Sequence, residues 1–358
     1  MGQREKQLIG EVIDSNFPND GKYTADFERR VAEACGVPYA VAVTSGTAAL
    51  FLGLAACGVE PGDEVIVPDI TFIASANAVR LAGATPVLVD VDPDSFCIDP
   101  AKILAAISPR TKAIMPVHVS GRAADIPAIL EIARAHGLRV VEDAAEALGS
   151  QAGGTQLGSF GEVGCFSFTA NKTITTGQGG MAITKDAAIH QRLRELKDQG
   201  RPVRGTGGAD VHVSVGYNFK FTDIQAAMGL AQLETLPERR EHLRHLFGLY
   251  RELLGDGANP RVHLPGFDTD GGACPQWVDA LVEGRDGLHD YLLERGIQTR
   301  KFWYPLHTQA PYRGDEENFP ASTRVSYNSL WLPSAFTLSD DDIHFVCQCI
   351  NDWTLSAL

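Results

Sequence analysis

The sequence lacks long apolar runs and is short of basic charge. Its 358 residues contain 31 Lys and Arg against 45 Asp and Glu, which gives a formal net charge of −14. That balance disfavours a nucleic-acid partner, because phosphate contacts need clustered Lys and Arg. No apolar stretch reaches the length that spans a bilayer, and the charged first 14 residues do not resemble a signal peptide. We therefore expect a cytoplasmic protein that binds neither membrane nor nucleic acid.

Cysteine is also scarce, and its seven copies have no spacing typical of a metal site or a disulfide framework. They are odd in number and scattered, and the closest pair, Cys347 and Cys349, is separated by a single residue. Neighbouring zinc ligands usually have at least two residues between them. We expect reduced packing residues and no bound metal.

What the sequence does contain is a regular alternation of short apolar strands and helices. Strands are expected at residues 39–44, 64–68, 85–90, 111–116, 138–143, 163–168 and 180–184, and helices at residues 26–35, 74–81, 101–107 and 126–137. This alternation is typical of an α/β fold with a mixed, mostly parallel sheet sandwiched by helices.

The pattern changes near residue 236. A helix expected over residues 222–236 is followed by a long charged helix and then by a Gly- and Pro-rich region between residues 255 and 272. The remainder has less Val and Ile than the first part. We predict a large α/β domain at residues 1–236 and a smaller α+β domain at residues 237–358, since the chain is long enough for two cores.

The first candidate site is Ser45-Gly46-Thr47, which lies between an expected strand and a helix that begins with small residues. Free backbone N–H groups and the positive end of the helix dipole favour a bound phosphate there. An ordinary helix cap by Ser45 or Thr47 is an equally good interpretation.

The second candidate is Asp143, at the C-terminal end of an apolar strand, where open α/β sheets place their ligand crevices. A carboxylate there can bind a ring nitrogen and keep it protonated. Glu146, expected one helical turn further along, can reach the same ligand. The alternative is that Asp143 only caps the following helix.

The third candidate is Lys172, which stands among small and hydroxylated residues ahead of a Gly-rich turn at residues 176–180. Since lysine normally lies in solvent, this setting suggests a Schiff-base role for a free amine. A surface lysine is the alternative. Taken together, a phosphate anchor, a pyridinium partner and an aldehyde partner form the set that pyridoxal 5′-phosphate (PLP) requires.

At this point the sequence resembles the DegT-type sugar aminotransferases, in the fold-type I class of PLP enzymes. The resemblance covers nearly the whole chain, with motifs at residues 43–50, 61–68, 71–77, 142–147, 167–172, 216–219, 224–227 and 231–234. Within the family, residues 109–118, 142–147 and 171–177 are most similar to GDP-perosamine synthases.

The resemblance implies PLP as the cofactor and a role for each matching residue. Lys172 matches the Schiff-base lysine that also moves the substrate proton, and Asp143 matches the partner of the pyridinium nitrogen. Phe72 matches the aromatic residue on the ring face, and Glu146 lies where the family has a side chain near the ring hydroxyl. The implied phosphate contacts are Ser45, Gly46, Thr47, Ser167 and, from a neighbouring subunit, Asn218. A homodimer with shared active sites is therefore implied.

The implied reaction transfers an amino group from an amino acid, expected to be glutamate, to a nucleotide-linked keto-sugar such as an NDP-4-keto-6-deoxyhexose. Such enzymes serve amino-sugar, lipopolysaccharide or natural-product biosynthesis. Tyr304 and His307 resemble positions near the sugar nucleotide, although a locally satisfied loop histidine explains His307 nearly as well. The alternatives are a cyclitol aminotransferase acting on a keto-inositol and a non-catalytic PLP-binding regulator. Relatives that dehydrate sugars have His in place of the lysine, which Lys172 argues against.

Three positions and one short stretch depart from the family pattern. Gln178 stands where Glu is usual, and Lys220 where Arg is common. Ser120 precedes Gly121 at a position that is usually aromatic, and residues 274–277 replace a stretch that often carries His with Tyr or Phe. These departures concern the substrate rather than the cofactor.

Overall fold

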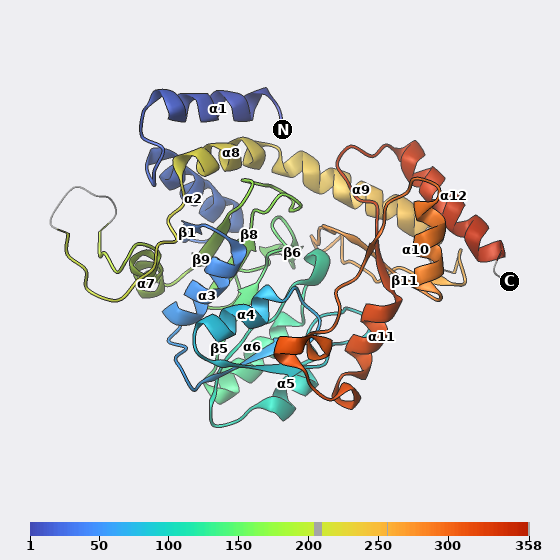
Figure 1. The fold of residues 1–358 in the computed structure, drawn as a ribbon, viewed down its shortest axis with the longest axis horizontal. Coiled ribbons are helices and arrows are strands. Elements are labelled where there is room, and N and C mark those ends of the chain that lie inside the picture. Colours follow the sequence, from blue (N-terminus) through green and yellow to red (C-terminus); the bar gives the residue numbers. More distant parts are fainter. Residues whose placement is uncertain (204–209, 256, 357–358) are drawn as a thin grey trace.

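A seven-stranded sheet forms the centre of the larger part of the molecule (Figure 1). The computed structural model describes residues 1–203, 210–255 and 257–356. The strand order is β1-β9-β8-β5-β4-β2-β3, and β9 alone among these seven strands runs antiparallel to its neighbours. The strands are β1 (Tyr39–Val43), β2 (Glu64–Pro68), β3 (Thr85–Val89), β4 (Thr111–Ile114), β5 (Arg139–Asp143), β8 (Val163–Ser167) and β9 (Gly180–Thr184). The predicted mixed, mostly parallel sheet is confirmed.

Both faces of this sheet are covered, because successive strand residues point to opposite sides. In β2, Val65 and Val67 pack in one layer and Ile66 packs in the other. The first layer contains α3 (Gly46–Ala56), α4 (Ala74–Leu81) and α7 (Ala187–Lys197). The opposite layer contains α2 (Lys22–Cys35) and α8 (Asp223–Glu234) beside β1, β9 and β8, and α5 (Pro100–Ala106) and α6 (Ile126–His136) beside β5, β4 and β2.

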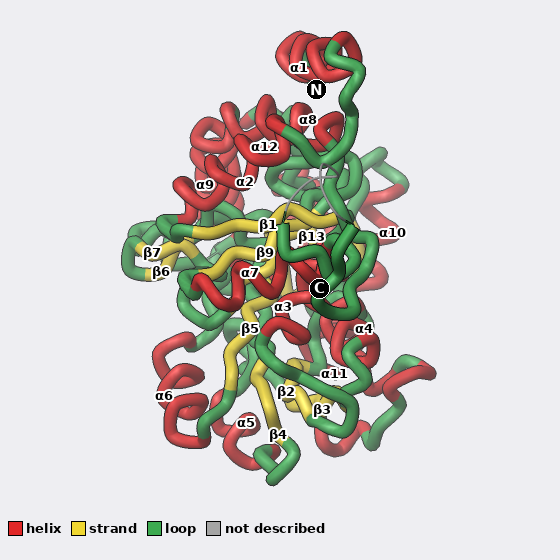
Figure 2. The backbone as a smooth tube through the Cα atoms, turned by 90° about the vertical axis from the view of Figure 1, so that its left-hand side faces the viewer, coloured by secondary structure: helices red, strands yellow, loops and turns green. Residues whose placement is uncertain are grey.

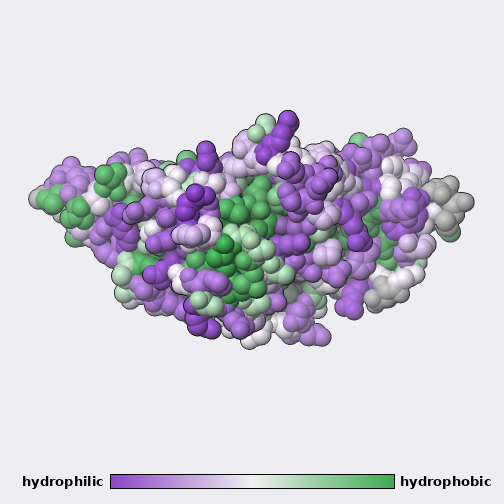
Figure 3. All heavy atoms as spheres, turned by 90° about the horizontal axis from the view of Figure 1, so that it is seen from below, coloured by the Kyte–Doolittle hydropathy of each residue, from purple (hydrophilic) through white to green (hydrophobic). Residues whose placement is uncertain are grey.

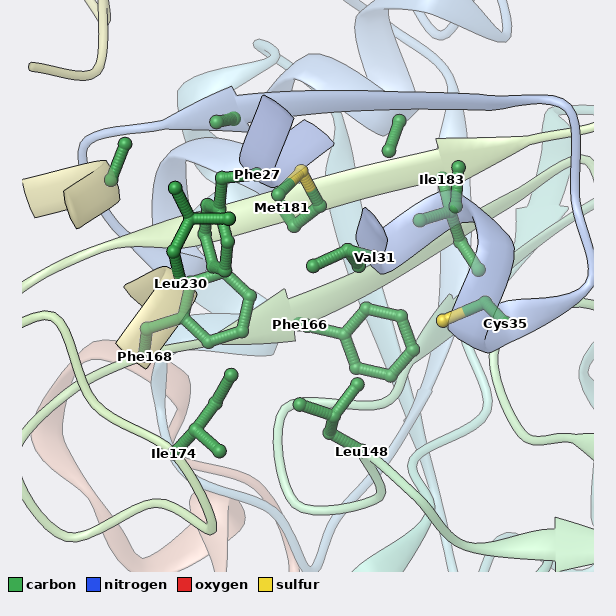
Figure 4. Packing of buried hydrophobic residues seen from close by; sticks show 14 of the residues in the cluster. Phe27, Val31, Cys35, Leu148, Phe166, Phe168, Ile174, Met181, Ile183 and Leu230 are labelled. Atoms are coloured by element: carbon green, nitrogen blue, oxygen red, sulfur yellow. The ribbon is translucent and has the colours of Figure 1, made fainter. Parts of the chain in front are cut away.

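Aromatic side chains fill the layer between α2, α8 and the sheet (Figure 4). Phe27 of α2 lies 5.3 Å from Phe168, measured between ring centroids, and Leu230 of α8 packs into the same cluster. Phe166 and Met181 contribute from β8 and β9. These side chains are buried, so this layer anchors the strands that lead to the site described below.

Local sequence determines where several helices begin and end. Gly36 and Gly137 adopt left-handed conformations, with φ of 67° and 66°, and end α2 and α6. The side chains of Ser45 and Thr222 accept hydrogen bonds from backbone N–H groups in the first turns of α3 and α8.

The C-terminal part is built on a second, antiparallel sheet. Its strand order is β10-β11-β13-β12, with β10 (Val262–His263), β11 (Val278–Val282), β12 (Arg300–Lys301) and β13 (Ser329–Leu332). The helices of this part are α9 (Leu236–Leu254), α10 (Arg285–Leu293), α11 (Pro320–Asn328) and α12 (Asp340–Ser356). Only Thr235 separates α8 from α9, which runs out to the second sheet (Figure 1). The domain boundary after residue 236 therefore falls at the start of α9 and stays a prediction.

The two sheets share one hydrophobic cluster. Phe302, Val325 and Trp331 of the C-terminal part pack in the same cluster as Ile66 of β2 and Ile114 of β4. One face of the large sheet is therefore completed by residues that come more than 150 positions later in the chain.

A buried ion pair reinforces this contact between the two parts. Arg122 Nη2 lies 2.8 Å from Asp279 Oδ2, and both side chains are almost fully buried. The hydroxyl of Ser120 and the indole N–H of Trp331 both donate to Asp279 Oδ1, at 2.9 and 2.7 Å. Both carboxylate oxygens of Asp279 are therefore occupied.

The remaining elements are peripheral. Helix α1 (Gln3–Asp14) lies at one end of the molecule (Figure 2) and packs through Leu8 and Val12. A small hairpin is formed by β6 (Gln151–Ala152) and β7 (Thr155–Gln156). Short 3-10 helices occur at η1 (Val119–Gly121), η2 (Leu306–Thr308), η3 (Ala310–Tyr312) and η4 (Glu316–Asn318).

One face of the surface and the state of the cysteines are as expected from the amino-acid composition. Seen from below, the face in Figure 3 is mostly hydrophilic around a hydrophobic patch near its middle. All seven cysteines are free and buried, as expected for packing residues. Across the described ranges, the helices are too short or too polar for a membrane span.

Candidate active site

A cavity of about 460 Å³ lies where the parallel strands of the large sheet end. Segments that follow β1, β2, β5 and β8 line it, because strands that run in the same direction end at the same edge of a sheet. The predicted site residues in this lining are Ser45, Gly46, Thr47, Phe72, Asp143, Glu146, Ser167 and Lys172. Segments far apart in the sequence thus meet at one cavity.

The start of α3 forms one wall of the cavity. Ser45 caps the helix by accepting a hydrogen bond from the Ala48 N–H at 3.1 Å, so the cap interpretation is confirmed. Gly46 and Thr47 lie in the first turn of α3, where backbone N–H groups have no partner within the helix and are suited to bind a ligand. A Cβ at position 46 would lie 2.9 Å from the Cβ of Ser167, so glycine is needed for these two segments to approach. A capped helix and a phosphate site are therefore compatible here.

Asp143 ends β5, and its buried side chain belongs to the lining of the cavity. Its Oδ1 accepts a hydrogen bond from the Ala145 N–H at 3.1 Å, and its Oδ2 accepts one from the Ser75 hydroxyl at 2.7 Å. Residues 144–150 form turns and irregular backbone. The expectation that Asp143 caps a helix, with Glu146 one helical turn away, is therefore wrong. The bond to Ala145 is the local Asp-to-backbone contact that favours turns over helix.

The electrostatic setting of Asp143 has opposing contributions. Burial raises the pKa of Asp143 above its ordinary value, while the Ser75 hydroxyl, the Ala145 N–H and the charge of Lys172 oppose that rise. The nearby carboxylate of Glu146 adds to the rise. A cationic ring nitrogen beside Asp143 would compensate the cost of burying its charge.

Lys172 lies in the cavity with only 13% of its side chain exposed. Its Nζ is 3.1 Å from Glu146 Oε1, so the two side chains form an ion pair. Glu146 is held from two other sides, by the Trp277 indole N–H at 3.2 Å and by the Ser120 backbone N–H at 2.9 Å. The alternative of a surface lysine is therefore wrong.

Phe72 lines the cavity and has 57% of its surface exposed. An aromatic side chain with so much free surface offers a flat face to a planar ligand. Thr71, the preceding residue, also lines the cavity but is buried.

Three predicted residues lie outside this lining. Asn218 is exposed on a segment that pairs with Asp198, so its proposed contact with another subunit stays a prediction. Tyr304 is exposed and packs edge-on against Tyr327.

His307 is buried close to Asp69, which follows β2. Its backbone N–H and its Nδ1 each lie 2.7 Å from an oxygen of the Asp69 carboxylate, and its ring stacks on Phe319. Its Nε2 has no hydrogen-bond partner among the described residues. Asp69 therefore satisfies the backbone N–H and Nδ1 of His307 but not its Nε2, and a role of His307 toward substrate stays a prediction.

Sequence reasoning missed the aromatic wall that the C-terminal part contributes. Trp277, Arg300, Trp303 and Trp331 all line the cavity. A second cavity of about 440 Å³ shares Lys172 and three of these four residues with the first, namely Trp277, Arg300 and Trp331. The aromatic run at residues 302–304 and the departure from the family pattern at residues 274–277 are sequence signals that could have indicated this wall.

Comparison with known proteins supports the resemblance to the sugar aminotransferases along nearly the whole chain. Residues 1–351 match the DegT/DnrJ/EryC1/StrS aminotransferase family. The chain is similar to a GDP-perosamine synthase of Caulobacter vibrioides (40% identity, 97% of this chain and 94% of that protein). It is also similar to one of Escherichia coli O157:H7 (37% identity, 98% and 95%). A crystal structure of an aminotransferase of the same family from Brucella abortus superposes with a TM-score of 0.92 at 32% identity, covering 98% of this chain and 95% of that one.

Proposed function

The chain belongs to the DegT/DnrJ/EryC1/StrS aminotransferase family, and from this premise we propose that it moves an amino group from glutamate to a nucleotide-linked keto-sugar. Membership makes it a PLP-dependent aminotransferase. The observation that supports the proposal most is the cavity in which Lys172, Asp143 and the start of α3 meet.

The cavity fits PLP at three separate points. The backbone N–H groups of Gly46 and Thr47 would hold the phosphate, together with the Ser167 hydroxyl. Asp143 would hold the ring nitrogen, and Phe72 would cover a face of the ring. When bound, PLP supplies an aldehyde that reacts reversibly with amines and a protonated ring that withdraws electrons.

The residues of the chain supply the proton transfers. The ion pair between Lys172 Nζ and Glu146 Oε1, 3.1 Å apart, holds the amine in the cavity, where the free amine would be the nucleophile toward the cofactor aldehyde. Lys172 then has the role of moving the proton of the reacting substrate carbon. Asp143 would hold the ring nitrogen in its protonated form, because an ionised carboxylate accepts but cannot donate.

A nucleotide-linked keto-sugar is the acceptor that we propose, and an NDP-4-keto-6-deoxyhexose is its leading form. Two of the similar proteins are GDP-perosamine synthases, which supports a GDP-linked sugar. The two cavities that meet at Lys172 offer room for a substrate larger than a free sugar. We place the reaction in the biosynthesis of amino sugars for surface polysaccharide such as lipopolysaccharide.

The test is an assay of the purified protein with glutamate against GDP-, UDP- and dTDP-linked 4-keto-6-deoxyhexoses and scyllo-inosose. We expect an aminated sugar with a GDP-linked acceptor, detected by mass spectrometry, and little product with scyllo-inosose. Amination of scyllo-inosose alone would favour the cyclitol aminotransferase. Failure to convert glutamate to 2-oxoglutarate with any acceptor would favour a regulatory protein.

We further propose a homodimer in which Asn218 of one subunit reaches the cofactor phosphate of the other. Its exposure in the single chain supports this assignment. Mixing Lys172→Ala with Asn218→Ala subunits should restore part of the activity, because one of the two shared sites then keeps both native residues. Complete absence of recovery after demonstrated subunit exchange would contradict the shared site.

The cytoplasm is the compartment that we propose. Seven buried cysteines, all free, support a reducing environment, since secreted proteins of similar cysteine content usually form disulfides. Fractionation of the native host would test it, and recovery of the enzyme outside the cytoplasm would contradict it.

A further inference from the structure

Asp143 is bonded to a short chain of two hydroxyl groups, of which Thr71 belongs to the lining of the cavity and Ser75 does not. Ser75, in the first turn of α4, is fully buried, and its Oγ lies 2.7 Å from Asp143 Oδ2. Thr71 Oγ1 lies 2.7 Å from the same Ser75 Oγ. Thr71 immediately precedes Phe72, so this chain joins the segment after β2 to the end of β5.

The direction of these hydrogen bonds follows from the chemistry of the groups. An ionised carboxylate only accepts, so the single proton of the Ser75 hydroxyl points to Asp143. Ser75 Oγ is then free to accept, and the Thr71 hydroxyl donates to it at 2.7 Å in preference to the Phe72 carbonyl at 3.2 Å. Each hydroxyl polarises the next one, which strengthens the bond to Asp143.

We propose that Ser75, supported by Thr71, is a positioning residue that keeps Asp143 ionised and aimed at the ring nitrogen of the cofactor. This inference rests on the proposed function, because it assigns Asp143 the pyridinium nitrogen as its partner. Ser75 is absent from the described lining of the cavity, so it acts through Asp143 and does not touch substrate or cofactor.

The arrangement on Asp143 explains why a hydroxyl is needed at position 75. The Ala145 N–H occupies Oδ1 and Ser75 occupies Oδ2, while each oxygen keeps a further site for a ligand. Both bonds oppose the rise in the pKa of Asp143 that burial causes, and the bond from Ser75 is the larger of the two. Without Ser75, the buried carboxylate would bind a proton more readily and hold the ring nitrogen less firmly.

The test compares Ser75→Ala, which removes the hydroxyl, with Ser75→Thr, which keeps it. In the PLP-loaded protein, ¹⁵N NMR of ring-labelled cofactor reports the protonation of the ring nitrogen as a function of pH. We expect Ser75→Ala to lose the ring proton at a lower pH than wild type and to slow half-transamination with glutamate about tenfold, the usual size for one hydrogen bond to a charged group. Ser75→Thr should restore both values.

Ser322 offers a matched control for a merely structural effect. It is also fully buried, and its hydroxyl donates to the Asp90 carboxylate at the same distance of 2.7 Å. Ser322→Ala should lower the thermal midpoint but leave the ring-nitrogen titration unchanged. If Ser75→Ala fails to fold, Ser75→Cys, a weaker donor of similar size, replaces it.

A double-mutant cycle separates failure of this inference from failure of the proposed function. In the background of Asp143→Asn, Ser75→Ala should cause no further loss of rate. If Asp143→Asn reacts as fast as wild type, the assignment of Asp143 itself is wrong. If Asp143→Asn is slow while Ser75→Ala keeps the wild-type rate and ring-nitrogen titration, only the role of Ser75 is overturned.

Discussion

Two buried aspartates, Asp143 and Asp279, differ in how many hydrogen bonds their carboxylates accept from the rest of the protein. Asp279 accepts hydrogen bonds from Ser120, Trp331 and the guanidinium of Arg122. Asp143 accepts one neutral donor on each oxygen and faces a cavity. Burial raises the pKa of both groups, but only Asp279 is bonded directly to a cation.

The difference separates a carboxylate that is paired within the protein from one that faces a cavity. An ionised carboxylate accepts about four hydrogen bonds, and a buried one is costly unless it is paired. The needs of Asp279 are met within the protein, where it links the two sheets. Asp143 accepts two hydrogen bonds, both from neutral donors, and so has room for a charged partner from the cavity. Removing groups from the two regions should therefore damage different properties.

The largest expected effect comes from replacing Lys172, a residue of the cavity. Lys172→Ala should abolish the covalent cofactor link that borohydride traps and slow transamination at least about a thousandfold, because the nucleophile and the general base are lost together. Mass spectrometry after borohydride reduction measures the link. Lys172→Arg is the matched control, since it keeps the charge beside Glu146 but cannot form the link. A trapped cofactor on another lysine would refute the assignment.

The corresponding change at Asp279 should damage stability instead. Arg122→Leu leaves a buried carboxylate without its cation, which usually costs about 3–5 kcal/mol of unfolding free energy. Urea unfolding measures the loss, and the folded protein should still form the cofactor link through Lys172. The double variant Arg122→Leu/Asp279→Asn should recover part of the lost unfolding free energy, because no buried charge is left unpaired. Equal stability of the single variant and wild type would contradict a structural role.

At Asp143, removal of the charge should affect the rate of reaction. Asp143→Asn keeps the size of the side chain and should still bind PLP through Lys172, but half-transamination should slow at least about a hundredfold, or roughly 3 kcal/mol. The protonated ring stabilises charge that develops only in the transition state, so the loss appears in the rate rather than in cofactor affinity alone. Single-turnover spectra with glutamate measure it. Near-normal conversion would make Asp143 a structural residue.

The smallest expected effect concerns the stability of the cofactor-free protein. Here Asp143→Asn should stabilise the fold, whereas the changes above impair activity or stability. The raised pKa of Asp143 means that its contribution to stability is fully present below the unfolded value of about 3.9 and is lost as pH rises through the folded value. At pH 7, Asp143→Asn should therefore raise the unfolding free energy by about 1 kcal/mol, a usual size for one substitution. Urea unfolding should show this difference in unfolding free energy between variant and wild type narrowing as the pH falls toward the unfolded value of about 3.9. A difference that does not change with pH would contradict this account.

The sequence predicted the sheet and the three segments that meet at the cavity, because each depends on neighbouring residues. Ser45-Gly46-Thr47, Asp143 and Lys172 all follow apolar strands, and parallel strands bring their ends together. The turn after Asp143 was misread as helix, since its run of alanines favours helix while the Asp143 side chain bonds its own backbone.

The rest of the site depends on contacts between residues that are distant in sequence. Trp277 reaches Glu146 across 131 positions, and Ser75 reaches Asp143 across 68. His307 was placed with the substrate, although its nearest partner is Asp69, 238 positions away. Spacing in a single sequence carries no signal for such pairs.

The hydrophobic cluster that the two sheets share has a consequence for synthesis of the chain on the ribosome. Strands β2, β4 and β5 are complete by residue 143, but the tryptophan that closes their cluster is residue 331. Domains usually fold as they emerge, with the N-terminal one first. In this protein, part of one apolar face of the large sheet therefore stays exposed until almost the whole chain has been synthesised. We therefore expect chaperones to engage this face during translation, and chains cut short before residue 331 to aggregate.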